Sequence, residues 1–192
     1  MRADLALVEA GLARSRSHAA TLIDAKRALV NGEAIRKPAQ HIVETASLTL
    51  LPAIDYVSRA GHKLAEALDQ FAELELVGKY CLDVGASTGG FTEVLLRRGA
   101  SSVVSIDVGH DQMVADLKDN PKVTCIEGFN ARELSPQTLA ATGVAKADFD
   151  VVVADLSFIS LTLVLEQILS VAPNADLVLL IKPQFEVGRQ SL

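Results

Sequence analysis

The sequence has 192 residues, of which 49% are hydrophobic, and its formal net charge is −6. This apolar content is enough for a sizeable buried core, in one domain or in two small ones. The negative net charge argues against a protein that binds nucleic acid through bulk charge alone. No apolar run reaches the ~18 residues that a membrane-spanning helix needs.

The N-terminus and the cysteines indicate a cytoplasmic protein. Asp4 and Glu9 interrupt the stretch in which a signal peptide would be apolar. Cys81 and Cys125 are the only cysteines, and neither belongs to a CxxC pair. We therefore expect buried free thiols in a reducing compartment, and no metal site.

Charge is unevenly distributed along the chain. Residues 1–50 hold seven Lys and Arg against five Asp and Glu, a balance of +2, whereas the remainder holds 11 against 19, a balance of −8. This asymmetry predicts two parts with different partners.

Two helices and a small sheet are predicted in the first part. Residues 3–12 carry apolar residues at helical spacing, and a second helix at 17–28 can be capped by Ser15 or Ser17. Next, the pair Asn31-Gly32 between two short apolar pieces is a strong hairpin signal. Residues 42–51, IVETASLTLL, alternate enough to form another strand.

Basic residues bracket the second predicted helix. Arg side chains can grip phosphates through paired hydrogen bonds, so the cluster could lie along an RNA backbone. Charge alone favours the alternative, a solvated helix face. Over its whole length, however, the segment RADLALVEAGLARSRSHAATLIDAKRALVNGEAIRKPAQHI resembles the ribosomal protein S4 RNA-binding domain, a type that binds structured RNA mainly by shape and backbone contacts. The resemblance implies RNA contacts by Arg2, Arg14, Arg16, Lys26 and Arg27. Lys26 is a departure, because the family usually has Gly there.

A break near Pro52 separates the second part, in which a helix from residue 58 precedes alternating strands and helices. Strands are predicted within 79–85, 102–109, 122–128, 149–156 and 175–183, and helices within 92–99, 113–119, 135–142 and 163–171. Strands that are apolar throughout, each followed by a crossover, predict a parallel sheet covered on both faces. Ligands bind such sheets beyond the carboxyl ends of the strands.

The turn after the first of these strands, Gly85-Ala86-Ser87-Thr88-Gly89-Gly90, suggests a cofactor site. It is not G-x-G-x-x-G, and no Lys follows as a phosphate loop requires. Alone it could be a tight packed bend, but Asp107 ends the next strand 22 residues after Gly85, where a carboxylate can accept both hydroxyls of a ribose. A helix N-cap is the equally favoured alternative for Asp107.

Three further features favour S-adenosylmethionine over a pyrophosphate. Gly89 and Gly90 would let the backbone press against a bulky ligand, and Asp83 could take a cationic amino group. Asn130 could reach an adenine amino group. The alternatives are that Asp83 bonds nearby backbone N–H groups and that Asn130 serves only its turn.

Three charged residues stand at apolar edges. Asp155 follows VVVA, Lys182 closely follows LVLLI, and Lys63 lies near the start of a helix. The ends of neighbouring parallel strands share one side of the sheet, so Asp155 and Lys182 should converge. From the pattern alone, an ordinary ion pair is the favoured interpretation.

Four segments, SRAGHKL, CLDVGASTGGFTEVLLRRGA, VVADLSFISL and IKPQFEVG, resemble the TlyA family. Its members were first labelled hemolysins and act in 2′-O-methylation of ribosomal RNA; they are also similar to FtsJ-type RNA methyltransferases. The resemblance implies a cofactor turn at Gly85–Phe91 and a target cytidine in ribosomal RNA or ribosomal subunits. Because the sequence has no spanning segment, we expect no membrane partner. The resemblance also implies a Lys-Asp-Lys-Glu tetrad, of which this sequence matches Lys63, Asp155 and Lys182.

An α/β protein is thus expected, with a small α+β S4-like domain at 1–52, a linker at 53–60 and a Rossmann-like methyltransferase domain at 61–192. We hypothesise that Lys182 is the general base for the ribose hydroxyl, that Lys63 favours the neutral form of Lys182, and that Asp155 orients both amines.

The fourth tetrad residue has no match in these 192 residues. The sequence stops soon after the fifth predicted strand, whereas the family continues through two further strands that carry the Glu, and Glu186 follows Lys182 too closely to replace it. We therefore expect a C-terminal truncation, an exposed sheet edge and weak or absent catalysis. The alternatives are a catalytically impaired RNA-binding protein and, ranked last because the sequence has no basic amphipathic helix with large apolar residues, a membrane-lysing hemolysin.

Overall fold

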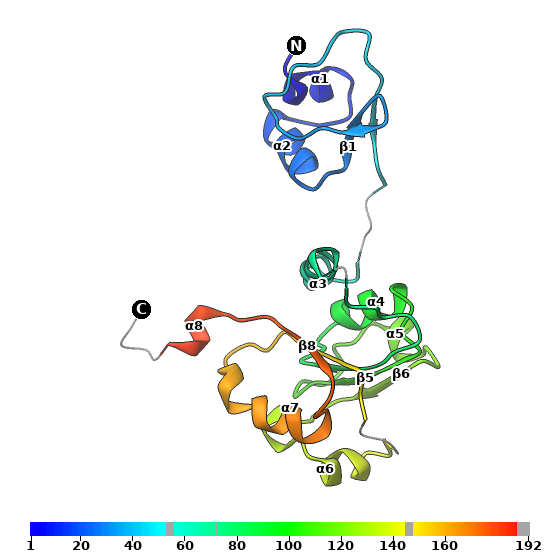
Figure 1. Ribbon diagram of the computed structural model, residues 1–192, viewed down its shortest axis with the longest axis vertical. Coiled ribbons are helices and arrows are strands. Elements are labelled where there is room, and N and C mark those ends of the chain that lie inside the picture. Colours follow the sequence, from blue (N-terminus) through cyan, green and yellow to red (C-terminus); the bar gives the residue numbers. More distant parts are fainter. Residues whose placement is uncertain (53–55, 72, 145–147, 188–192) are drawn as a thin grey trace. The chain divides into compact units, whose positions relative to one another are not determined.

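The computed structural model describes residues 1–52, 56–71, 73–144 and 148–187, and the chain divides into two compact units between residues 55 and 56 (Figure 1). Residues 53–55 of the expected linker lie outside the described residues. The last two linker residues, 59 and 60, already belong to a helix of the second unit.

The N-terminal unit packs two helices against a small antiparallel sheet. The helices are α1 (Ala3–Glu9) and α2 (Arg16–Asp24), and the sheet has the order β2-β1-β3, with strands β1 (Ala28–Val30), β2 (Glu33–Ala34) and β3 (Leu48–Leu50). Ser15 is the cap of α2, because its hydroxyl accepts the His18 N–H at 3.2 Å. The predicted hairpin is present, with Asn31 at φ 51° and Gly32 at φ 85°.

The strand expected at 42–51 is shorter than predicted. Only Leu48–Leu50 pairs with β1, because the chain before it is engaged elsewhere. The Ile42 N–H donates to the Met1 carbonyl at 2.7 Å, and Ile42 itself is buried in the core of this unit. The segment at 42–47 therefore ties the N-terminus to the core instead of extending the sheet.

Helix α2 ends in a left-handed residue. Lys26 has φ 54°, its N–H donates to the Ile23 carbonyl, and the Arg27 N–H donates to the Leu22 carbonyl, both at 2.9 Å. These are the two bonds of a Schellman motif, in which the left-handed position favours glycine. The geometry explains why glycine suits this position, and it shows that Lys26 keeps the same exit from the helix at a cost in backbone strain.

The Lys26→Gly variant should therefore be more stable than the natural protein. We expect the free energy of unfolding of the N-terminal unit to rise by about 1 kcal/mol, because the left-handed strain disappears. Urea unfolding followed by circular dichroism measures this change. Lys37→Gly, at an exposed position outside the left-handed region, is the matched control and should give no gain; an equal gain there would contradict the explanation.

The C-terminal unit is built on a five-stranded parallel sheet, as predicted. Its strands are β4 (Tyr80–Val84), β5 (Ser102–Ile106), β6 (Val123–Ile126), β7 (Val151–Ala154) and β8 (Asp176–Leu179), in the order β6-β5-β4-β7-β8. In chain order, β5 and β6 are added on one side of β4, and the chain then crosses over so that β7 and β8 are added on the other side of β4. The switch point therefore lies between β4 and β7, where an open α/β sheet binds its ligand.

Helices cover both faces of this sheet (Figure 1). Helices α3 (Arg59–Gln70) and α4 (Gly90–Arg97) pack on one face against Cys81, Val103, Val151 and Val153. Helices α6 (Pro136–Ala141) and α7 (Leu165–Val171) pack on the other face against Leu82, Val84, Val104 and Val152. Alternate strand residues thus serve opposite layers. The remaining elements are α5 (Ala115–Lys118), η1 (Ala131–Glu133), η2 (Leu161–Leu163) and α8 (Pro183–Glu186).

Both cysteines are free thiols, although only Cys81 is fully buried and Cys125 is partly exposed. Among the described residues, no helix is both long enough and apolar enough to cross a membrane.

Candidate active site

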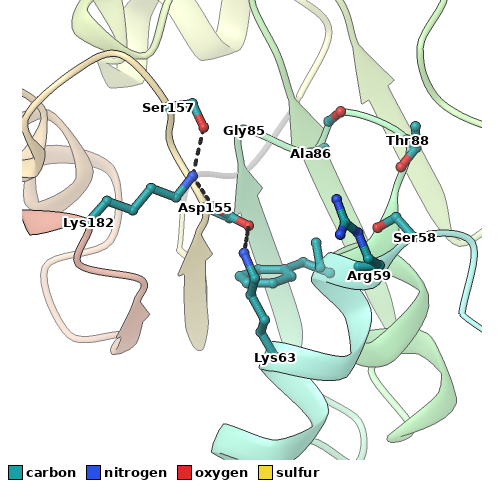
Figure 2. A pocket seen from close by; sticks show the side chains of 12 residues that line it. Ser58, Arg59, Lys63, Gly85, Ala86, Thr88, Asp155, Ser157 and Lys182 are labelled. Carbon is teal, nitrogen blue, oxygen red and sulfur yellow. Dashed lines mark hydrogen bonds and ion pairs between the residues drawn. The ribbon is translucent and has the colours of Figure 1, made fainter. Parts of the chain in front are cut away.

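A cavity of about 580 Å³ lies beyond the carboxyl ends of β4 and β7, at the switch point of the sheet (Figure 2). It is lined by the start of α3, by the turn after β4 and by the segments that follow β7 and β8. Eight of the residues predicted for the site line it: Lys63, Gly85, Ala86, Ser87, Thr88, Phe91, Asp155 and Lys182.

The three predicted catalytic residues meet in this cavity. Asp155 directly follows β7 and has the same parity as Val151 and Val153, whose side chains face α3 and α4. One of its carboxylate oxygens lies 3.6 Å from the Lys63 amine of α3, and the other lies 2.5 Å from the Lys182 amine. One carboxylate therefore pairs with amines that are 119 positions apart in the sequence.

The two amines differ in their access to solvent. The Lys63 side chain is 52% exposed, whereas those of Lys182 and Asp155 are 17% and 13% exposed. Lys182 also donates to the Ser157 hydroxyl at 2.7 Å. Lys182 is thus the amine held in place at the cavity wall, and Lys63 is the more hydrated cation.

Gly89 and Gly90 have a packing role besides the predicted approach to a ligand, which stays a prediction. Gly89 and Gly90 were predicted to make room for a ligand. A Cβ at Gly89 would lie 2.4 Å from Leu117, and one at Gly90 would lie 2.2 Å from the Ser58 hydroxyl. Protein atoms therefore take the space that these glycines leave, and Gly90 lets α3 approach α4 closely enough to bring Lys63 to the cavity.

Asp107 holds the turn through backbone groups. Its two carboxylate oxygens accept the Ser87 N–H at 2.8 Å and the Gly109 N–H at 2.7 Å. The predicted contact with a ribose would use the acceptor capacity that remains on these oxygens. Asn130 accepts the Arg132 N–H at 3.1 Å and caps η1, which agrees with the alternative that it serves its own turn. Neither residue lines the cavity, and their cofactor roles stay predictions.

Asp83 is fully buried beneath α4 and does not line the cavity. One of its oxygens accepts the Thr92 hydroxyl at 2.6 Å, and that hydroxyl also contacts the Ser105 hydroxyl at 2.7 Å. Within the described part of the chain, the other oxygen has no hydrogen-bond partner. Loss of hydration by burial raises the pKa of Asp83 to about 7, and the bond from Thr92 opposes this shift.

The basic residues predicted for RNA binding fall into two groups. Arg2 and Arg16 both bond to the buried carboxylate of Asp4, and their guanidinium groups hold its pKa well below the usual range. Arg27 donates to the Leu51 carbonyl at 3.2 Å. These three residues therefore stabilise the fold as well as presenting charge. Arg2, Arg14, Arg16 and Lys26 are all exposed, and Arg27 is half-buried.

Four residues of the cavity wall were not predicted from the sequence: Ser58, Arg59, Ala60 and Ser157. Ser157 stands two positions after Asp155, and Arg59 stands one helical turn before Lys63, and both line the cavity. Their spacing was the available signal, since Arg59 and Lys63 share a helix face. A hydroxyl in a loop and a charge near a helix start are common, so this signal is weak.

Asp83 should make the stability of the C-terminal unit depend on pH. A carboxyl whose folded pKa is about 7 and whose unfolded pKa is near ~3.9 binds its proton more tightly when folded, so stability should fall as pH rises from about 4 to about 7. Asp83→Asn should abolish that component. Urea unfolding of both proteins across this pH range isolates it as the difference between them, and identical pH profiles would refute it.

Comparison with known proteins gives consistent matches. Residues 56–192 match the FtsJ-like methyltransferase family, and residues 1–45 match the S4 domain. The 16S/23S rRNA (cytidine-2′-O)-methyltransferase TlyA of Mycobacterium tuberculosis is 48% identical over 191 residues, which cover 98% of this chain and 69% of that protein. Hemolysin A of Brachyspira hyodysenteriae is 40% identical over 190 residues, covering 98% of this chain and 77% of the relative. A solved structure of a protein labelled hemolysin from Streptococcus thermophilus superposes with a TM-score of 0.66 at 35% identity, covering 100% of this chain and 69% of that one.

Proposed function

This chain belongs to the TlyA family of FtsJ-like methyltransferases, and from that premise we propose that it methylates the 2′-hydroxyl of a cytidine ribose in ribosomal RNA, with S-adenosylmethionine as the methyl donor. The observation that supports this most directly is the meeting of Lys63, Asp155 and Lys182 in the cavity at the switch point of the sheet. The target nucleotide is taken from the names of the relatives, and such a substrate would be met in the cytoplasm.

The cavity residues fit S-adenosylmethionine. Ser87 and Thr88 line the cavity as part of the glycine turn, and Arg59 offers a cation for a carboxylate. Asp107 stands beside the turn as an acceptor for ribose hydroxyls. When bound, the cofactor supplies a methyl group whose bond to the sulfonium sulfur breaks as its bond to the ribose oxygen forms, leaving a neutral thioether and one proton for the protein to accept.

Lys182 is the base in this proposal. The neutral amine takes the proton of the ribose hydroxyl, forming an N–H bond as the O–H bond breaks. Lys63 lies on the far side of the shared carboxylate, and Asp155 holds both amines beside the cavity. Placing base and hydroxyl in contact contributes much of the remaining rate enhancement.

The N-terminal unit would hold the RNA. It matches the S4 domain and carries the positive charge of an otherwise acidic chain, with Arg14 and Lys26 exposed. Contacts from such side chains to phosphates set affinity and register without reading sequence. This division assigns RNA positioning to the first unit and chemistry to the second.

A second candidate function is RNA binding without methyl transfer. The fourth member of the family tetrad is a Glu, and Glu186 does not stand in for it. The Glu186 carboxylate accepts the Ser160 hydroxyl at 2.5 Å and the Leu161 N–H at 2.9 Å, so it is committed to the start of η2. The transfer assay separates the two candidates.

The assay is incubation with unmodified ribosomal subunits and methyl-labelled S-adenosylmethionine, followed by nuclease mapping. We expect label on a cytidine ribose and a loss of at least about 100-fold in rate for Lys182→Ala, because the base is removed. Lys79→Ala is the matched control, since Lys79 pairs with Asp150 away from the cavity. Undiminished transfer by Lys182→Ala would remove Lys182 from the mechanism, and RNA binding without label would favour the second candidate.

RNA binding should depend on the exposed cations beside α2. We expect Arg14→Glu to weaken binding of a structured ribosomal RNA fragment about tenfold and to reduce its dependence on salt, because a phosphate contact is lost. Filter binding at two salt concentrations measures both effects. Lys37→Glu makes the same change of charge elsewhere in this unit; an equal loss there would show that only bulk charge matters.

A further inference from the structure

The segment that follows β7 holds the Lys182 amine at two points (Figure 2). Asp155 lies 2.5 Å from the amine nitrogen, and the Ser157 hydroxyl accepts from the same nitrogen at 2.7 Å. Lys182 comes from the segment after β8, so the segments after two neighbouring strands supply the amine, its ion-pair partner Asp155 and its hydrogen-bond acceptor Ser157. Ser157 has no part in the family tetrad described above.

The role of Ser157 follows from the number of hydrogens that the Lys182 amine carries in its charged and neutral forms. A charged lysine has three N–H groups, whereas a neutral one has two and a lone pair. The 2.5 Å contact with Asp155 is an ion pair without hydrogen-bond geometry, so Ser157 is the hydrogen-bond acceptor of the amine among the described residues. When Lys182 is neutral, one N–H group donates to Ser157, and the lone pair therefore points away from that hydroxyl. Asp155, Ser157 and the amine all line the cavity. Without Ser157, no hydrogen bond would fix the rotation of the amine about its Cε–Nζ bond.

Ser157 is itself held in place by the fold. The loop that carries it is anchored at its far end, where the Glu186 carboxylate accepts the Ser160 hydroxyl and the Leu161 N–H. Glu186 belongs to α8, the helix that Lys182 precedes. The loop and the lysine segment are therefore joined at both ends, and Ser157 has a fixed position from which to orient the amine.

We propose that Ser157 is a positioning residue that directs the lone pair of Lys182 toward the substrate hydroxyl, an inference that rests on the proposed function. As the hydroxyl oxygen forms its bond to the methyl carbon, its proton moves to this lone pair. The amine then has three N–H groups: one stays on Ser157, one faces Asp155 across the ion pair, and the new one points to the product oxygen. Atoms and charge balance in this step, because the methyl donor leaves as a neutral thioether and the amine becomes positively charged.

A direct test measures the mobility of the amine without any reaction. In protein labelled with ¹⁵N-lysine, relaxation of the side-chain NH₃⁺ groups in mildly acidic buffer reports how freely each one rotates. We expect Lys182 to be restrained relative to exposed Lys37, to become mobile in Ser157→Ala, and to stay restrained in Ser157→Thr, which keeps the hydroxyl. A Lys182 signal that is as mobile as Lys37, or unchanged by Ser157→Ala, would overturn the proposal.

The kinetic test uses the same variants in the methyl-transfer assay. Ser157→Ala should lower kcat about tenfold while KM stays within about twofold, because orientation of the base is lost and substrate binding is not. Ser157→Thr should recover kcat to within about threefold of the natural protein. A loss that appears in KM instead, or that the Thr variant does not recover, would show that Ser157 does not act through Lys182.

Ser160→Ala is the matched control, since it removes a hydroxyl of the same loop that bonds Glu186 and not Lys182. Equal losses of kcat in both Ala variants would assign the effect to loop anchoring and refute the positioning role. If the natural protein transfers no methyl group, the proposed function fails, while the relaxation measurement still decides whether Ser157 restrains the amine.

Discussion

The Asp155 carboxylate is the contact on which the site depends. It is held at the end of β7, where its parity places it on the same side of the sheet as α3, and it pairs with one amine on each side. Removing it would take away the one carboxylate that both amines contact, and Lys63 would lose its ion-pair partner. Sheet order and strand parity therefore matter to this site as much as the identity of the three charged residues.

The rest of the C-terminal unit keeps that carboxylate and the glycine turn in register. Gly90 allows α3 to pack closely on α4, which brings Lys63 within 3.6 Å of Asp155. Asp107 fixes the turn through two backbone N–H groups. Asp83, buried beneath α4, links its strand to that helix through Thr92. Acidic residues that the sequence patterns assign to ligand binding thus also stabilise the fold. The two roles are compatible, because each carboxylate oxygen can accept more than one hydrogen bond.

The N-terminal unit shows the same overlap of structural and binding roles. Arg2 and Arg16 neutralise a buried acid, which leaves fewer of their N–H groups for a phosphate. Arg14 and Lys26 have exposed side chains, and Lys26 keeps a left-handed backbone where glycine would be unstrained. A cation at that position adds charge at some expense of stability.

The sequence by itself determined the five parallel strands, the hairpin at Asn31-Gly32 and the candidate charged residues, because periodicity and turn chemistry are local properties. The family motifs added the tetrad. Only the tertiary structure decided that Gly89 and Gly90 serve packing, that residues 42–47 leave the small sheet, and that Ser157 holds Lys182. These outcomes depend on distances between segments that are far apart in the chain, and such distances are set by strand order and helix packing, which no local pattern specifies.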